Sequence, residues 1–298
     1  MPGLNVTGGF SQLLSKDYEK IFFDEFGRHE KEYAKVAKID NFDGAYKKEG
    51  ELMGLSKLQR MYEGQEIPYE AFVQGNEKEL RPRNFGLGVQ LTEDMYDDDR
   101  TGHMKDMMKE LGKAADYSLE VEYWDLLNSG FVTTNRTGID SKALFADDHE
   151  SLDGTVTIDN QATASSLSTS SLQAMYNYYE TLKDERGRPV KMKPKTLIIP
   201  PQLRWKAEEL MLSEYNPENA NMQYNTVKGL QYMICHYLTS TTAWFVLGED
   251  HDLRFIWRKQ LAFKSSDDFN TSSALFKVTA RYRADFVRFR GAYGNAGA

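Results

Sequence analysis

The chain has 298 residues, of which 40% are hydrophobic and 12% aromatic, so it can bury a substantial core and does not belong to the disordered class. Its 45 acidic residues outnumber the 37 basic ones and give a formal net charge of −8. Because the cations are interleaved with acids instead of forming a block, the composition argues against a protein that grips nucleic acid.

Cysteine use and hydropathy indicate the compartment. The single cysteine, Cys235, excludes an internal disulfide and a multi-cysteine zinc site, which fits a reducing environment. The N-terminal sequence lacks a basic region followed by an apolar run. No stretch approaches the roughly 18 apolar residues of a transmembrane helix. We therefore expect a protein that is made and folds in a cytoplasm.

The first 91 residues predict a short helix and a long hairpin. Leucines and aromatics recur at helical spacing from Leu13 to Phe26, with Gly27 as a stop, and the strand-like "YAKVAKID" follows. Residues 41–91 combine many charges with alternating patches such as "IPYEAFV" and "FGLGVQL", punctuated by Gly and Pro. This pattern predicts a solvent-exposed β-hairpin, and exposed extended strands invite pairing with other chains.

The strongest helix signal follows the hairpin. Methionines and small residues form one apolar stripe from Met104 to Ser118, and the pattern continues to Gly130. A helix over 103–129 would be roughly 40 Å long, which predicts a structural spine.

The rest of the chain mixes loops, helices and short strands. Residues 131–168 are typical of a loop, and 169–186 predict a second helix. "TLIIP" predicts a buried strand, with Pro201 in the first turn of the next helix. From 227 onward short strands dominate, and the alternation from Phe276 to Phe289 predicts half-exposed strands. The fold class is α+β.

Two groups of residues that could suggest catalysis are better explained as structural. Cys235 and His236 are adjacent on a predicted strand, so their side chains would point to opposite faces and could not act as nucleophile and base. Asp250, His251 and Asp252 follow Gly248 between two apolar strands, which is typical of a turn.

Two further acidic groups are also weak sites. Asp147, Asp148 and His149 lie in a polar loop, and the run 97–99 is typical of a solvated helix start. Phosphate-binding, nucleophile-elbow and zinc-protease motifs do not occur in the sequence. We expect no catalytic residue, no cofactor and no metal.

Five stretches in the C-terminal half carry a family resemblance. They are "KALFADDH", "ERGRPVKMKPKTLIIPPQLRWKAEELM", "NPENANMQYNTVKGLQ", "AWFVLGEDHDLRFIWR" and "FKVTARYRADFVRFRGAYG". Together with the order of arm, hairpin, spine helix and α/β body, they resemble tailed-phage major capsid proteins of the Hong Kong 97 type. Within that fold they are most similar to the Mu-type major head subunit group.

The resemblance implies an organisation for the whole chain. Residues 1–40 would be the N-arm, 41–91 the E-loop hairpin, and 92–149 the spine helix with the start of the peripheral domain. Residues 150–250 would be mainly the axial domain, and 251–298 the terminal strands of the peripheral domain.

The resemblance also implies a non-enzymatic function. Such subunits assemble as pentamers and hexamers, in the bacterial host cytoplasm, into an icosahedral shell around double-stranded DNA. Their partners are portal and scaffolding proteins and, in some shells, decoration proteins; they enclose DNA without sequence-specific binding and touch no membrane. Two alternatives stay open: an encapsulin-like nanocompartment shell, and a metal-dependent hydrolase using Asp147, His149, Asp250 and His251.

The charged hairpin suits pairing with a neighbouring subunit. We expect inter-subunit contacts from the following cations, with three acids as candidate partners. They are Lys47, Lys48, Arg60, Lys78, Arg81 and Arg83, with Glu93, Asp97 and Asp98.

Overall fold

The computed structural model describes residues 8–92, 95, 102–152, 154, 156–216, 224–268, 271 and 273–298, with side chains from residue 16 onward. The chain divides into two compact units. The first unit comprises residues 1–45, 81–123 and 255–284, and the second comprises 46–80, 124–254 and 285–298. None of the described helices is long and apolar enough to span a membrane.

The first unit is built on a four-stranded sheet with strand order β1-β11-β12-β4. The strands are β1 (Lys38–Asn41), β11 (Leu253–Asp268), β12 (Ser273–Phe286) and β4 (Arg83–Thr92). Side chains of β12 alternate between buried and more exposed positions, as predicted, and the buried set includes Phe276, Val278 and Tyr282. One face of the sheet is therefore apolar and needs a cover.

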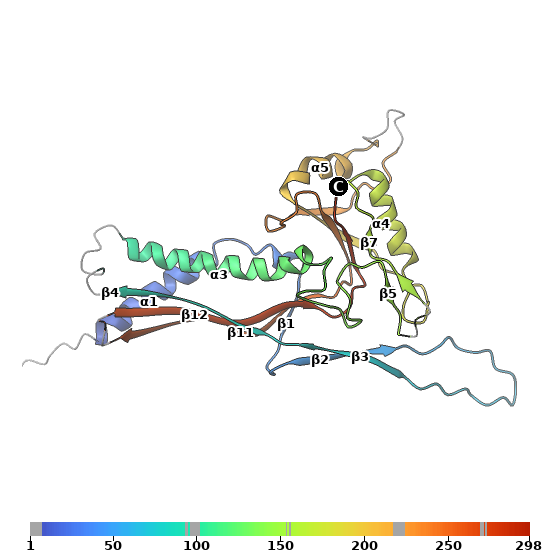
Figure 1. Ribbon diagram of the computed structural model, residues 1–298, viewed down its shortest axis with the longest axis horizontal. Helices are drawn as coiled ribbons and strands as arrows, with labels where there is room; N and C mark the ends of the chain where they lie inside the picture. The colour runs from blue at the N-terminus through green and yellow to red at the C-terminus, as the bar shows by residue number, and fades with distance from the viewer. Residues whose placement is uncertain are drawn as a thin grey trace, which may run out of the picture. The chain divides into compact units, whose positions relative to one another are not determined.

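Two helices supply that cover. The spine helix is confirmed as α3 (His103–Asn128), and α1 (Gly8–Phe26) confirms the N-terminal helix. Phe22 of α1 packs with Leu111 of α3 and Val278 of β12 in one apolar cluster. Figure 1 shows α3 running along the strands of this sheet. Residues 33–40 differ from the extended strand that the sequence predicted, because a 3₁₀ turn (Tyr33–Lys35) precedes β1.

The close approach of α1 to α3 depends on Gly112. A Cβ at this position would lie 2.9 Å from the carbonyl oxygen of Phe22 and 3.3 Å from the backbone nitrogen of Phe26. We expect Gly112→Ala to displace α1 and lower the free energy of unfolding by about 1–3 kcal/mol, since backbone cannot move aside as a side chain can. Thermal unfolding would measure the loss. Lys113→Ala on the same helix removes only a surface ion pair with Glu110 and should change stability little; equal losses in the two variants would contradict this role of Gly112.

The second unit is built on a five-stranded mixed sheet with strand order β7-β13-β10-β8-β9. The strands are β7 (Gln161–Ala162), β13 (Ala292–Asn295), β10 (Trp244–Gly248), β8 (Pro194–Ile199) and β9 (Gln231–Ile234). The predicted buried strand "TLII" is the end of β8, whose last three residues are buried. Every residue of β10 is buried, as expected for a central strand.

Helices α4 (Thr169–Thr181) and α5 (Arg204–Leu212) pack on this sheet through a shared apolar cluster. Ser168 caps α4, because its hydroxyl accepts a hydrogen bond from the backbone N–H of Ser171. Pro201 begins a short 3₁₀ turn that leads into α5, at the place predicted for it. The predicted loop 131–168 contains one short strand pair, β5 (His149–Glu150) with β6 (Thr157–Ile158).

The hairpin differs in extent from the predicted one. Its paired strands are β2 (Lys47–Met53) and β3 (Val73–Leu80), both in the second unit. Residues 83–92, which the sequence placed in the same hairpin, form β4 and pair with β12 instead. The glycines of β4 explain the fit, because a Cβ on Gly88 would lie only 3.2 Å from the carbonyl oxygen of Phe276.

Candidate functional site

The loop between β2 and β3 exposes a run of large apolar side chains. Residues 54–72 form neither helix nor strand, and Figure 1 shows them extending beyond the paired strands. Leu58 is 99% exposed and Tyr69 is 95% exposed. The other exposed apolar side chains of the loop are Leu55, Met61, Tyr62, Ile67 and Phe72. A stretch this apolar, left in water, marks an interaction site. We call residues 57–69 the tip.

The base of the hairpin is held by a buried ion pair. Lys78 of β3 places its Nζ 2.6 Å from Oδ1 of Asp285, whose side chain is fully buried. The same ammonium donates a hydrogen bond to the carbonyl of Phe286 and lies 4.6 Å from the centre of its ring. Lys78 therefore fixes β3 to Asp285 and Phe286, the last two residues of β12.

A second ion-pair group holds strand β2. The Arg254 guanidinium lies between Glu49 of β2 and Asp252, 2.6 Å from Oδ1 of Asp252. Burial alone would raise the pKa of Glu49, but Lys47 and Arg254 outweigh it and hold that pKa below its ordinary value. Asp252 also accepts a hydrogen bond from the backbone N–H of Arg288. Glu49 and Asp252 thus pair with Arg254 from two sides.

Two arginines clamp the ends of the loop. Arg186 donates from Nε to the carbonyl of Gly54 at 2.8 Å, and its guanidinium lies 2.7 Å from Oε1 of Glu70. Arg188 donates to the carbonyl of Leu55 at 2.9 Å. Glu70 also accepts hydrogen bonds from the backbone and hydroxyl of Ser56. Residues 54–56 and 70 are thereby tied to the 183–189 turn, and the tip begins directly beyond them.

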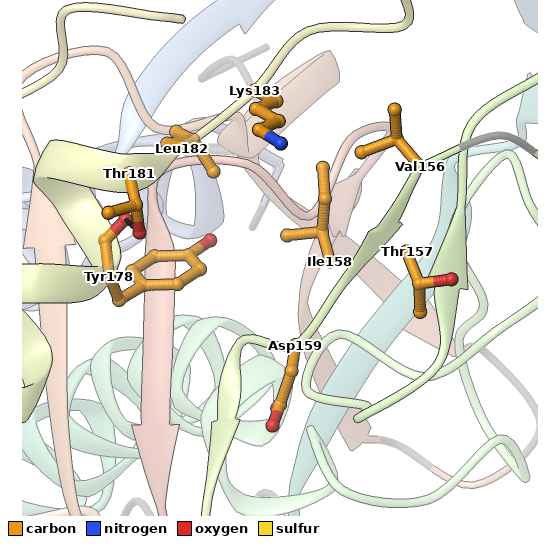
Figure 2. A pocket seen from close by; sticks show the side chains of 8 residues that line it. All are labelled: Val156, Thr157, Ile158, Asp159, Tyr178, Thr181, Leu182 and Lys183. Atoms are coloured by element: carbon orange, nitrogen blue, oxygen red, sulfur yellow. Dashed lines mark hydrogen bonds between the residues drawn. The ribbon is translucent and has the colours of Figure 1, made fainter. Parts of the chain in front are cut away.

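The second unit also contains a pocket of about 380 Å³ between β6 and the end of α4. The hydroxyl of Tyr178 points into it, and burial raises the pKa of this phenol well above its ordinary range. Figure 2 shows Lys183 and Asp159 at opposite ends of the pocket. The lining residues therefore do not bring an acid and a base together.

The predicted contact residues have several different environments. Lys48 lies 3.4 Å from Glu79 and 3.7 Å from Glu77 across the hairpin, and Lys47 lies 2.9 Å from Glu49. Arg60 is exposed on the tip, with its guanidinium 5.3 Å from the ring of Tyr62.

The other predicted contact residues are two arginines and three acids. Arg81 and Arg83 are exposed, and Arg83 begins β4. Glu93, Asp97 and Asp98 lie outside the described residues.

The structure gives Lys78 an environment that differs from the predicted one. The sequence suggested that it faces a neighbouring subunit, whereas its ammonium is directed inward to Asp285 of its own chain. The anchoring residues Arg186, Arg188 and Arg254 were not predicted. The sequence carries a hint of the first two only, the dense run of charges in the "ERGRP" turn.

The catalytic candidates are engaged in structural contacts. Cys235 is fully buried and His236 is exposed, but both lie just after β9 ends at Ile234, so they do not share the predicted strand. His251 accepts a hydrogen bond from the backbone of Leu253 within the predicted turn, and Asp252 pairs with Arg254.

The candidate residues of the 147–149 loop also have structural surroundings or lie in solvent. His149 is buried, stacks on Phe289 with ring centres 3.6 Å apart, and its Nδ1 lies 2.5 Å from Oδ2 of Asp140. Burial would raise the pKa of Asp140, but the hydrogen bond and charge of His149 lower it overall. Asp147 and Asp148 are exposed. Within the described part of the chain, no group of three or more His, Cys, Asp or Glu side chains could hold a metal ion.

Known proteins share this architecture. A family model described as phage capsid protein matches residues 76–295. The capsid protein of bacteriophage JBD30, solved in a capsid decorated with minor capsid protein trimers, is 18% identical. That match covers 71% of this chain and 92% of that one, with a TM-score of 0.56. No curated protein matches the sequence significantly.

Two further structures match over most of the chain at lower identity. A structure from Microbacterium phage Oxtober96 is 9% identical, covers 91% of this chain and 92% of that one, and has a TM-score of 0.57. A structure of the mature capsid of bacteriophage PhiM1 is 8% identical, covers 91% of this chain and 88% of that one, and has a TM-score of 0.58. The predicted Hong Kong 97-type fold is confirmed. The chain therefore belongs to the phage capsid protein family.

Proposed function

We propose that copies of this protein join as pentamers and hexamers into an icosahedral shell around double-stranded DNA, with the β2–β3 hairpin as a clasp between neighbours. The quoted C-terminal motifs support membership of the Mu-type group. In this proposal residues 1–40 are the N-arm and 46–80 the E-loop. The first unit, with α3, supplies the peripheral domain, and 150–250 supply most of the axial domain.

The surroundings of the shell follow from the same proposal. Assembly takes place in the host cytoplasm, with portal, scaffolding and decoration proteins as partners and no catalytic role for the chain. The net charge of −8 supports a shell that repels packaged DNA and lets the genome slide. Engagement of His149, His251 and Asp252 in structural contacts supports the absence of catalysis.

One observation carries the clasp: an exposed apolar tip on a rigidly anchored base. Leu58, Ile67 and Tyr69 are each at least 65% exposed, while the strands behind them are fixed by ion pairs that are buried or partly buried. Full burial of one such side chain contributes about 1.5–3 kcal/mol. An anchored base keeps the tip from losing much entropy on docking, so more of this energy is available for assembly.

The test is a triple variant of the tip. We expect Leu58→Ser with Ile67→Ser and Tyr69→Ser to leave the melting temperature of the subunit unchanged, because these side chains lie in water. Closed shells should be lost in electron micrographs of the expressed protein. A matched control, Gln59→Ser with Glu66→Gln, alters the same loop without removing apolar area and should assemble normally. Normal shells from the triple variant would rule out the clasp.

A further inference from the structure

Three strands of the first unit are rich in cations and poor in acids. Residues 83–92 of β4, 255–266 of β11 and 273–283 of β12 contain no aspartate or glutamate. Their seven cations are Arg83, Arg258, Lys259, Lys264, Lys277, Arg281 and Arg283. The chain as a whole has 45 acidic residues against 37 basic ones, so the rest of it is more acidic still. Positive charge is therefore concentrated in one sheet of an acidic protein.

Strand alternation directs four of these cations away from the helices. Phe276 and Val278 of β12 and Phe263 of β11 pack with residues of α1 and α3. Neighbouring side chains on a strand point to opposite faces of the sheet. The cations on the face away from the helices are Lys264, Lys277, Arg281 and Arg283. We call these four residues the cationic face.

The two lysines of the cationic face are not neutralised by the subunit itself. Lys264 and Lys277 are exposed, and neither ammonium has an ion pair or a hydrogen bond among the residues that the structure describes. In contrast, Lys47, Lys48 and Lys78, on the paired strands of the hairpin, all have carboxylate partners. Exposed charges of one sign without counter-charges set the potential of the surface that carries them. The face is therefore ready to attract an anionic partner.

The arginines of the cationic face are oriented by backbone carbonyls. Arg281 donates from Nε to the carbonyl of Pro82 at 3.4 Å, and Arg283 donates from Nη1 to the carbonyl of Arg81 at 3.5 Å. Because a carbonyl carries no net charge, these contacts position the guanidinium groups without cancelling their charge. An oriented guanidinium can bind a carboxylate through two parallel hydrogen bonds.

Glycines on the adjacent strand leave the cationic face accessible. In β4, Gly88 lies opposite Lys277 and Gly86 lies opposite Thr279. Glycine in a strand often marks a place where another backbone or a ligand approaches closely. β4 ends the strand order β1-β11-β12-β4, so no further strand of the described chain pairs with its outer edge. A partner can therefore reach Lys277 across this edge.

We propose that the cationic face binds the acidic surface of a second copy of this chain. The excess of acids lies outside these strands, so another copy offers the carboxylates that the face lacks. At about 0.15 M salt, repulsion between the net charges of two copies is largely screened beyond about 8 Å, whereas charges in contact still attract. The proposal rests on the assembly proposed above and names a second surface, besides the tip, that joins copies.

Duplex DNA is the other class of anion that a basic surface attracts. A duplex is a long polyanion, and it would extend beyond four side chains onto the acidic surface of the same subunit, which repels it. A neighbouring subunit needs to place only a few carboxylates against the face. The charge distribution therefore favours a protein partner.

Charge reversal at the two exposed lysines tests the face. We expect Lys264→Glu with Lys277→Glu to weaken self-association of the full chain at least about tenfold in sedimentation velocity, because attraction becomes repulsion. The melting temperature should change little, since both side chains are exposed. Lys264→Gln with Lys277→Gln should have an intermediate effect. Lys105→Glu with Lys109→Glu, on exposed positions of α3, changes the net charge equally and should associate like the wild type.

Zero-length cross-linking identifies the partner groups. A carbodiimide joins a lysine amine to a carboxylate that it touches. Mixing copies of normal and heavy isotope content separates links between copies from links within one copy in mass spectrometry. We expect Lys277 in links between copies.

Unchanged self-association of the lysine variant, an equal loss in the α3 control, or lysine links confined to single copies would overturn the proposal. It would also fall if the variant lost binding to a fluorescent DNA duplex while its self-association stayed normal, because phosphates would then be the partner. A wild-type chain that stays monomeric would overturn it as well. Wild-type oligomers that never close into shells would remove the icosahedral shell and leave the cationic face in place.

Discussion

Replacing Lys78 with methionine should lower the free energy of unfolding of the second unit by about 3–5 kcal/mol. The substitution leaves the carboxylate of Asp285, whose side chain is fully buried, without its counter-charge at 2.6 Å. Methionine preserves the length of the side chain and its contact with the ring of Phe286, so the change isolates the charge. Urea unfolding curves, with thermal unfolding by calorimetry as a second measurement, would give the loss of free energy.

A neighbouring lysine provides the control. Lys48 pairs with Glu77 and Glu79 on the solvent side of the same hairpin, with half of its side chain exposed. Lys48→Met should therefore change stability little, because solvent screens an exposed ion pair. Adding Asp285→Asn to the Lys78 variant should restore part of the loss, because no uncompensated charge then stays buried. Equal effects of the two lysine variants would show that the Lys78 pair is not an anchor.

The spine helix and the buried strands could be predicted because their signals are local. The apolar stripe predicted a helix over 103–129, and α3 spans His103–Asn128. "TLIIP" predicted the end of β8, and Gly and Asp predicted the turn after β10. In each case the residues that decide the local structure lie within a few positions of each other in the sequence.

The end of the hairpin could not be predicted, because it depends on a distant partner. Residues 83–92 alternate as a hairpin strand would, but their ladder runs along β12, from Thr92 opposite Ser273 to Arg83 opposite Tyr282. Nothing in "FGLGVQL" distinguishes a neighbour in the hairpin from a partner almost two hundred residues away. Strand periodicity fixes which side chains share a face, and the tertiary fold fixes what that face meets.

At the candidate site, too, the sequence pattern shows which face a lysine lies on but not which residue it meets. Lys78 lies between Glu77 and Glu79 in the sequence, so alternation places it on the opposite face of β3. That pattern was readable, but it did not say that this face meets Asp285. The same applies to Arg254, whose partner Glu49 lies 205 residues away in the sequence.

The second large effect is expected at Asn160, which is fully buried. Its side-chain amide donates to the carbonyls of Leu144 at 2.8 Å and Ala292 at 3.0 Å, and its Oδ1 accepts from the backbone N–H of Ala146. The residue thus joins the 144–146 loop to β13. We expect Asn160→Ala to cost about 3–5 kcal/mol, because it removes the partner of two buried carbonyls and of the half-buried N–H of Ala146.

A charged isostere makes the argument sharper. Asn160→Asp keeps the shape but points an anionic oxygen at the carbonyls of Leu144 and Ala292, so it should be less stable than Asn160→Ala at neutral pH and recover as the acid is protonated. Gln173→Ala is the control, since this amide is exposed and makes a single hydrogen bond to Thr226. Thermal unfolding at pH 5 and pH 8 would separate the three variants. A loss at Asn160 no greater than at Gln173 would mean that packing around Phe145, and not the amide, holds the loop to β13.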